Sequence, residues 1–213
     1  MRKIVIRVFR WGVNANFIAE GGLVSDEMKE RVPPGQRVTA RLPRLDLGVI
    51  PKFNEGKWRL RVEGFAERPL KLTFAEVLKL PRMSETADFH CVTGWSRLDN
   101  KWDGVLFKTI VETARPKPEV KFVTFECSDG YTTSLPLADL LAGNVMLAYM
   151  LDGQMLEAKH GGPLRMVIPD KYGYKSAKWV ETIRFTIDEE VGYWEQRGYS
   201  DTADPWTEDR YSR

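Results

Sequence analysis

The hydrophobic segments of this sequence are short, and glycine or proline separates most of them. Its 213 residues include 17 glycines and 12 prolines. Residues 58–62 alternate apolar and polar side chains, a pattern typical of a half-buried strand. Apolar runs at residues 120–125, 164–168 and 179–187 predict further strands. Short strands of this kind dominate the sequence.

Three short helices are predicted among these strands. Thr73 and Glu76 have the spacing of a capping box, and the apolar residues that follow predict a helix that ends before Pro81. Residues 107–114 fit a second helix, and residues 135–141 fit a third.

A hairpin is the clearest local signal. Asp152-Gly153 stands between the apolar residues 146–150 and 154–156. No internal repeat and no convincing linker divides the sequence. Because helices are few and short, the pattern favours a β-rich α+β domain over a doubly wound parallel sheet.

Length and composition are those of one ordinary globular domain. Hydrophobic residues make up 43% of the chain and charged residues 29%, which is enough apolar material for a sizeable core. The 32 basic and 30 acidic residues leave a net charge of +2, which gives no argument for nucleic acid or a membrane as partner. No segment approaches the roughly 18 consecutive apolar residues of a membrane helix.

The cysteines and the N-terminus point to a reducing compartment. Cys91 and Cys127 are the two cysteines, and their spacing suggests neither a disulfide framework nor a zinc site. The apolar stretch within residues 1–10 is too short for a signal peptide, so we expect a cytoplasmic protein. Residues 1–40 are expected to form an irregular N-terminal lead-in to a domain at residues 41–213.

Residues 88–96, Asp-Phe-His-Cys-Val-Thr-Gly-Trp-Ser, are the first stretch that could carry chemistry. Cys91 stands beside His90 and among glycine and small hydroxyl residues, which predicts a turn with free backbone N–H groups. Such surroundings lower the pKa of a thiol from about 8.5 and prepare it to bind a soft metal or attack an electrophile. On composition alone, a small buried side chain is the favoured interpretation of both Cys91 and Cys127.

Two further stretches could bind an anion or a polar ring. Between His160 and Arg165, two glycines let the backbone approach a ligand closely, and the two side chains could both donate hydrogen bonds. Residues 171–179 interleave three lysines with aromatic and small residues, which suits a phosphate or stacked single-stranded nucleic acid. A plain glycine turn and a solvated basic loop are the structural alternatives.

Two other functions remain open on these residues alone. No Ser-His-Asp pattern is evident, and two histidines cannot make an all-histidine metal site. A metal-independent hydrolase or transferase could use Cys91 with His90 or His160. A nucleic-acid-binding module without enzymatic activity could use residues 171–179.

In this order and spacing, the stretches resemble the molybdopterin-binding domain of the sulfite oxidase family, and in particular its small bacterial sulfite oxidase-like members. The resemblance covers roughly residues 40–211. The motifs that carry it are Cys91-Val92-Thr93-Gly94-Trp95-Ser96, Trp102-x-Gly104-Val105, Tyr131-Thr132-Thr133-Ser134-Leu135-Pro136-Leu137, His160-Gly161-Gly162-Pro163-Leu164-Arg165, Lys171-Tyr172-Gly173-Tyr174-Lys175-Ser176-Ala177-Lys178-Trp179 and Gly192-Tyr193-Trp194-Glu195-Gln196-Arg197-Gly198-Tyr199.

The resemblance implies a β-rich, mixed-sheet sulfite-oxidase molybdopterin-binding fold with short helices, in an oxidoreductase domain at residues 41–213. It implies molybdopterin and molybdenum as cofactor, with Cys91 as the only protein ligand to the metal, where a soft thiolate is suitable. The residues that it places on the pterin or its phosphate are Leu45, Asp46, His90, His160, Arg165, Ser176, Ala177 and Lys178.

The function implied is a two-electron oxo transfer on a small substrate, with sulfur compounds among the candidates. Arg97 and Tyr193 are the candidates for substrate contact. The familiar sulfite pocket is in doubt, because Val191 stands where animal and plant sulfite oxidases carry a tyrosine. The haem and dimerisation domains and the export signal of some relatives are expected to be absent. Electrons are therefore expected to pass to or from an external partner protein.

Overall fold

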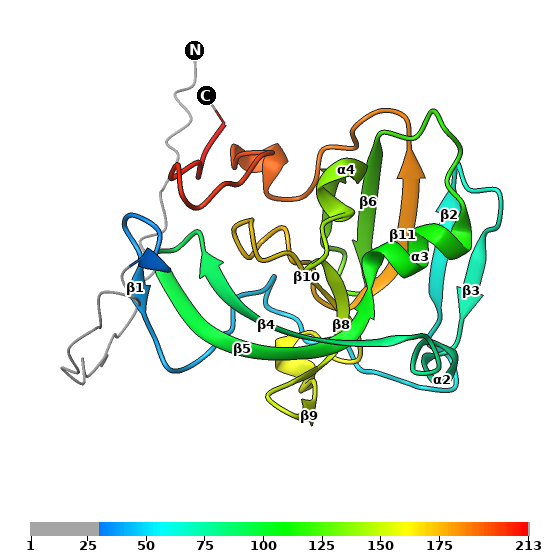
Figure 1. Cartoon of the computed structure of the whole chain (residues 1–213), viewed down its shortest axis with the longest axis horizontal. Coiled ribbons are helices and arrows are strands. Elements are labelled where there is room, and N and C mark those ends of the chain that lie inside the picture. The colour runs from blue at the N-terminus through cyan, green and yellow to red at the C-terminus, as the bar shows by residue number, and fades with distance from the viewer. Residues whose placement is uncertain (1–29, 213) are drawn as a thin grey trace, which may run out of the picture.

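The computed structural model describes residues 30–212, which fold into two β-sheets with a few short helices (Figure 1). In the first sheet the strand order is β1-β5-β8-β10, with β4 paired to β5 and β9 paired to β8. In the second sheet the order is β3-β2-β11-β6-β7. The pairs β1–β5 and β2–β11 are parallel and the other pairs are antiparallel, which confirms the predicted β-rich mixed-sheet fold.

The first sheet consists of β1 (Arg37–Val38), β4 (Arg82–Cys91), β5 (Trp95–Leu106), β8 (Met146–Leu151), β9 (Gln154–Met155) and β10 (Arg165–Val167). The second consists of β2 (Leu60–Gly64), β3 (Leu70–Leu72), β6 (Phe122–Cys127), β7 (Thr132–Pro136) and β11 (Val180–Thr186). The α-helices that lie wholly within residues 30–212 are α2 (Phe74–Val77), α3 (Phe107–Ala114) and α4 (Leu137–Leu140), and the 3₁₀-helices there are η1 (Ala158–His160) and η2 (Glu195–Arg197).

Several local predictions are confirmed. The capping box at α2 is present: Thr73 Oγ1 accepts a hydrogen bond from Glu76 N at 3.2 Å, and Thr73 N donates to Glu76 Oε2 at 2.8 Å. Helix α3 has the predicted bounds. Strands β8 and β9 pair across Asp152 and Gly153, both of which have positive φ as a tight hairpin turn requires.

Other local predictions are wrong or incomplete. Strands β4 and β5, which form a long hairpin, and β7 were not predicted. The predicted helix at residues 135–141 begins only at Leu137, because Leu135 and Pro136 pair with β6 at the end of β7. The outer half of β4 is largely exposed, so its charged side chains hide the apolar alternation that identifies a strand.

The apolar core positions the inner ends of these strands. The larger cluster lies between the sheets and includes Leu60, Phe107, Phe125 and Ile183. A smaller cluster on the first sheet contains Phe89, Trp102 and Met146 among others. Gly104 of β5 lies so close to the backbone of β8 that an added Cβ would be 2.7 Å from Ala148 Cα.

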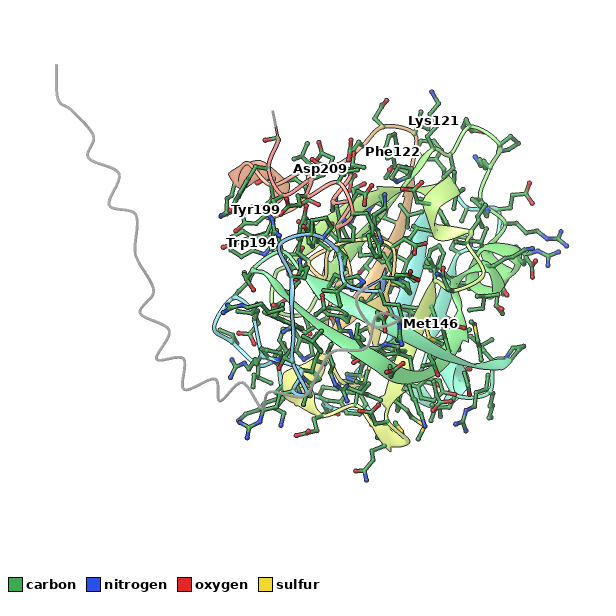
Figure 2. The ribbon with its side chains drawn as sticks, turned by 60° about the vertical axis from the view of Figure 1, so that its left-hand side comes forward. Lys121, Phe122, Met146, Trp194, Tyr199 and Asp209 are labelled. Atoms are coloured by element: carbon green, nitrogen blue, oxygen red, sulfur yellow. The ribbon has the colours of Figure 1, made fainter. Side chains whose placement is uncertain are left out.

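Both ends of the described chain pack on the turn between β4 and β5. Strand β1 pairs with the start of β5 at Trp95 and Ser96. The tail, residues 192–212, returns to the same turn, where Arg210 donates to the carbonyl oxygen of Val92. The rings of Trp194 and Tyr199, labelled in Figure 2, have centroids 5.1 Å apart.

Residues 1–29 of the predicted lead-in lie outside the described residues, and the boundary at residue 40 stays a prediction. Within the described part, the lead-in contributes β1. None of the helices described here is both long enough and apolar enough to cross a membrane.

Candidate functional site

Cys91 is the last residue of β4, and residues 92–94 turn the chain into β5. Its side chain is buried, at 7% exposure, and Sγ lies 3.2 Å from Thr93 Oγ1. Gln36 Nε2 donates to the carbonyl oxygen of Cys91 at 3.1 Å, and Gly94 N donates to the same oxygen at 3.0 Å. Arg210 donates a hydrogen bond to the carbonyl oxygen of Val92. Gln36 and Arg210, from the two ends of the described chain, thus both bind the backbone of this turn.

The predicted lowering of the Cys91 thiol pKa is wrong for the protein chain by itself. Burial raises the pKa of Cys91, while Thr93, Arg210 and Lys178 act in the lowering direction with smaller effect. A thiol in such surroundings is a poor nucleophile without further activation. A bound metal ion deprotonates a coordinating thiol directly, so burial is compatible with a ligand role.

No Cys–His pair is formed at Cys91. His90 Nδ1 lies 2.8 Å from Ser96 Oγ, and burial lowers the pKa of His90. The one side-chain hydrogen-bond partner of the Cys91 thiol among residues 30–212 is Thr93. Because a cysteine hydrolase needs a base within hydrogen-bond reach of its nucleophile, this arrangement does not favour that alternative.

Arg165 of β10 is a buried cation whose hydrogen bonds in residues 30–212 all go to backbone carbonyls, while its guanidinium lies 5.3 and 5.2 Å from the ring centroids of Phe89 and Trp102. Its guanidinium donates to the carbonyl oxygens of His160 at 2.9 Å, Ser176 at 3.2 Å and Met166 at 3.2 Å. Burial lowers the pKa of Arg165 to about 10. Within the part of the chain that the structure describes, no carboxylate forms an ion pair with Arg165. A buried charge normally has such a partner.

Lys178, largely buried with its side chain 16% exposed, is the second cation of this region. Its Nζ donates to the carbonyl oxygen of Leu45 at 2.6 Å and lies 3.6 Å from Asp46 Oδ2. Burial, followed by the charge of Arg165, lowers the pKa of Lys178 to about 8. The same ammonium acts electrostatically on Cys91, which links the two predicted stretches.

The predicted residues Leu45 and Asp46 therefore do meet the lysine stretch. Leu45 contributes its carbonyl oxygen, since its side chain is exposed. The guanidinium of Arg44 is the main cause that holds the pKa of Asp46 below its usual value. Asp46 is thereby kept as a carboxylate beside Lys178.

The glycine turn after His160 closes against both cations. Gly161 has φ of +104°, and a Cβ there would lie 2.9 Å from Lys178 Cγ and 3.1 Å from Arg165 Cβ. Only glycine fits this position without displacing them. Burial is the main cause that lowers the pKa of the half-buried His160, and Arg165 and Lys178 also contribute. Three basic groups thus converge here.

Ser176 and Ala177 immediately precede Lys178 in the sequence. They belong to the segment of residues 171–178, which we call the lysine loop. Ser176 Oγ accepts from the backbone N–H of Ile168 at 3.0 Å. Ala177 is buried, and its carbonyl oxygen accepts from Met166 N at 2.8 Å. These bonds attach the lysine loop to β10, which carries Arg165.

The lysine loop does not offer its charges to solvent. Lys175 is completely buried, Lys178 is mostly buried, and Lys171 pairs with Asp139 at 3.0 Å. Trp179 is 1% exposed, so it cannot stack on a base. This arrangement does not favour the nucleic-acid-binding alternative.

The two residues predicted to contact substrate are not joined to Cys91 by any described hydrogen bond. Arg97 donates to Asn100 at 2.7 Å and to Asp152 at 2.5 Å, and it lines a cavity of about 310 Å³ together with His160. Cys91 and the lysine loop do not line this cavity.

Tyr193 lies in the aromatic part of the tail. Its ring centroid is 5.1 Å from that of Trp194, and the guanidinium of Arg197 lies 3.6 Å from the Tyr193 ring centroid. These contacts give Tyr193 a packing role in the tail.

Sequence reasoning missed Gln36 and Arg210, which bind the backbone around Cys91. Gln36 is 55 residues from Cys91, and Arg210 is 118 residues from Val92. Neither belongs to a recognisable motif, so the sequence offers no signal for them. Thr93 stands inside the quoted stretch, and its spacing from Cys91 was the available signal.

Proteins commonly hold metal ions with clusters of cysteine, histidine, aspartate and glutamate side chains. No group of three or more histidine, cysteine, aspartate or glutamate side chains that could hold a metal ion is found in residues 30–212. A metal held by Cys91 would take its further ligands from a bound cofactor.

Comparison with known proteins identifies such a cofactor. The family model described as "Oxidoreductase molybdopterin binding domain" matches residues 47–194. The chain is 45% identical over 183 residues to "Uncharacterized oxidoreductase YuiH" of Bacillus subtilis, covering 85% of this chain and 92% of that protein. It is 33% identical over 151 residues to "Putative protein-methionine-sulfoxide reductase subunit YedZ1" of Azospira oryzae, covering 71% of this chain and 57% of the relative.

A solved structure agrees with this assignment. The sulfane dehydrogenase SoxCD from Paracoccus pantotrophus superposes with a TM-score of 0.60 at 25% sequence identity. The match covers 66% of this chain and 41% of that one. The resemblance to sulfite oxidase-like enzymes, the enzyme class and the cofactor are thereby confirmed. The chain belongs to the molybdopterin-binding oxidoreductase family, whose cofactor contains molybdopterin and molybdenum.

Proposed function

We propose that this enzyme performs two-electron oxo transfer on a small substrate, with Cys91 as the protein ligand to molybdenum. When bound, the cofactor supplies the redox chemistry of a metal that cycles between the +6 and +4 states. The observation that carries the proposal is the pair of cations Arg165, which is buried, and Lys178, which is largely buried and whose charge acts on the Cys91 thiol. Their charge calls for an anion that the described residues supply only in part, through Asp46.

The residues present fit a phosphate-bearing pterin. Arg165 and Lys178 can hold the phosphate end, where charged hydrogen bonds are strongest because water is excluded. On the same loop, the backbone of Ser176 and Ala177 and the hydroxyl of Ser176 are further groups that we assign to the phosphate end. We propose that His160, whose carbonyl oxygen accepts from Arg165 and which precedes the glycine turn, hydrogen-bonds the pterin.

Three residues have supporting roles in the proposal. Leu45 and Asp46 close the phosphate end by fixing the Lys178 ammonium. His90 orients the strand behind Cys91 through its bond to Ser96. For a metal thiolate, such surrounding hydrogen bonds determine ligand orientation and metal affinity.

We infer that the substrate is a small sulfur compound and that a separate protein carries the electrons. Two relatives support the substrate class: one is named as a protein-methionine-sulfoxide reductase subunit and the other as a sulfane dehydrogenase. Arg97, which lines a cavity together with His160, and Tyr193 remain the proposed substrate contacts. Both cysteines are free, which agrees with the proposed location in the cytoplasm.

Cofactor analysis of the purified protein tests the proposal. Protein made in a host that synthesises molybdopterin should contain molybdenum and pterin in stoichiometric amounts and should turn over at least one sulfite, sulfoxide or N-oxide. Metal-free protein that hydrolyses esters or amides, and loses this activity on alkylation, would support the thiol-dependent alternative instead. Binding to nucleic acid that collapses with rising salt would support the other alternative.

A further inference from the structure

A buried ion pair joins the lysine loop to the tail. Lys175 Nζ lies 2.5 Å from Glu195 Oε1 and donates to the carbonyl oxygen of Ser134 at 3.1 Å. Thr133 Oγ1 donates to the same Glu195 oxygen at 2.7 Å. The side chains of Lys175 and Glu195 are 0% and 2% exposed. Both charges are therefore removed from solvent and compensated mainly by each other.

Lys175 immediately precedes Ser176, Ala177 and Lys178, the loop residues that we assign to the phosphate. The hydroxyl of Ser176 accepts a hydrogen bond from the backbone N–H of Ile168, and its carbonyl oxygen accepts one from the Arg165 guanidinium. Lys175 N donates to Tyr172 O at 2.9 Å, so the loop is a tight turn at this point. A shift of Lys175 must therefore move Ser176, and with it the hydrogen bond to Arg165.

The tail that carries Glu195 is packed against β7. Tyr193 N donates to the carbonyl oxygen of Thr132 at 2.9 Å. A Cβ on Gly192 would lie 2.6 Å from Glu195 Oε2 and 2.7 Å from Thr133 Cα, so the backbone has no room to withdraw. The Glu195 carboxylate is thus a fixed point to which the loop is attached.

A buried ion pair of this kind contributes more to fixing the arrangement of the side chains than to the free energy of unfolding. Taking two charges out of water costs about as much as their attraction returns, and a matched apolar pair is often equally stable. A hydrogen-bonded ion pair, however, allows one arrangement, whereas apolar side chains pack in several. This difference makes the two roles separable by mutation.

We propose that the Lys175–Glu195 pair is a positioning device that fixes the lysine loop in the geometry that retains the phosphate end of molybdopterin. The inference rests on the proposed function, because it requires the loop to bind the cofactor. It assigns neither residue to the chemistry of the reaction.

Three proteins made in a host that synthesises the cofactor test this proposal. They are the wild type, the variant Lys175→Met/Glu195→Leu, and the control Lys171→Met/Asp139→Leu. The control removes the partly exposed ion pair that joins the same loop to α4. The measurements are the melting temperature, and the molybdenum and pterin retained over time after dilution and dialysis.

The expected result separates retention from stability. Freed of cofactor, all three proteins should melt within a few degrees of one another. The Lys175→Met/Glu195→Leu variant should lose molybdenum and pterin about tenfold faster than the wild type, as is typical when groups that orient a metal site are removed. The control should retain both as the wild type does.

If the double variant does not fold, the same measurements are made on a single variant. Glu195→Gln keeps the shape of the side chain but weakens its hold on Lys175, and it should also release the cofactor faster. Retention equal to wild type in the folded variants, or equal loss in the control, would overturn the positioning role. Wild-type protein that contains no molybdenum or pterin would instead overturn the proposed function.

Discussion

Arg165 and Lys178 carry charges that the carboxylates among residues 30–212 compensate only in part, through Asp46. Each donates mainly to backbone carbonyl oxygens, and burial lowers the pKa of both. Isolated charges are expensive to remove from water. We interpret their burial as preorganisation for an anionic ligand, which would compensate them on binding.

The ionisation of Lys178 gives a testable pH dependence in cofactor-free protein. Its pKa is lowered from 10.5 to about 8. Between these values the unfolded chain binds more protons than the folded chain, so the free energy of unfolding rises with pH across this interval. The rise should amount to about 3 kcal/mol, and it should be absent in Lys178→Met.

Urea unfolding below about pH 8 and above about pH 10 measures this difference. The exposed Lys108, replaced by Met, is the matched control and should keep the wild-type pH dependence. Identical pH profiles for the wild type and Lys178→Met would show that the ammonium is not buried as described.

Among the elements, the hairpin of β4 and β5 does most to position the site. It brings Cys91 to one end of the first sheet, and the pairing of β5 with β8 anchors it to the core. Gly104 is the point of closest approach between β5 and β8, which explains why this position has no side chain.

Replacing Gly104 by alanine should therefore destabilise the sheet. The new Cβ would lie 2.7 Å from Ala148 Cα and closer still to the carbonyl oxygen of Leu147. Overpacking of this kind lowers the free energy of unfolding by about 1–3 kcal/mol. Gly143→Ala is the control, because nothing lies within 4 Å of its added Cβ. Equal denaturant midpoints for the two variants would contradict the close contact.

The sequence predicted the elements whose signals are local. The apolar period of α3, the capping box at Thr73 and the turn at Asp152 each lie within a few residues, and each was confirmed. The hairpin of β4 and β5 was missed because its outer half is exposed and charged, so that pairing rather than burial pattern defines it.

The site was predictable only through the resemblance. Spacing alone could not show that Leu45 meets Lys178, a contact between residues 133 positions apart. It also could not show that Lys175 forms a buried pair with Glu195. Contacts of this kind depend on tertiary structure, which carries no local pattern.

At the scale of the whole molecule, segments distant in sequence enclose the site. Residues 30–46 contribute Gln36 and Leu45, and the tail contributes Glu195 and Arg210. A ligand that binds the folded chain in such an enclosure stabilises the entire fold by mass action.

Cofactor loading should accordingly raise the melting temperature. A ligand present at a thousand times its dissociation constant stabilises the folded state by about 4 kcal/mol. Protein from a host that cannot make molybdopterin should melt several degrees below protein from a competent host, as followed by calorimetry. Equal melting temperatures for loaded and cofactor-free protein would argue against an enclosed site.

The coordination of molybdenum by Cys91 is tested most directly by X-ray absorption spectroscopy of the loaded protein. Wild type, Cys91→Ser and Cys127→Ser are compared, since both cysteines are buried and free. Cys91→Ser should show one sulfur ligand fewer on the metal and lose turnover, while Cys127→Ser should match the wild type. An unchanged sulfur count in Cys91→Ser, with activity retained, would contradict the assignment.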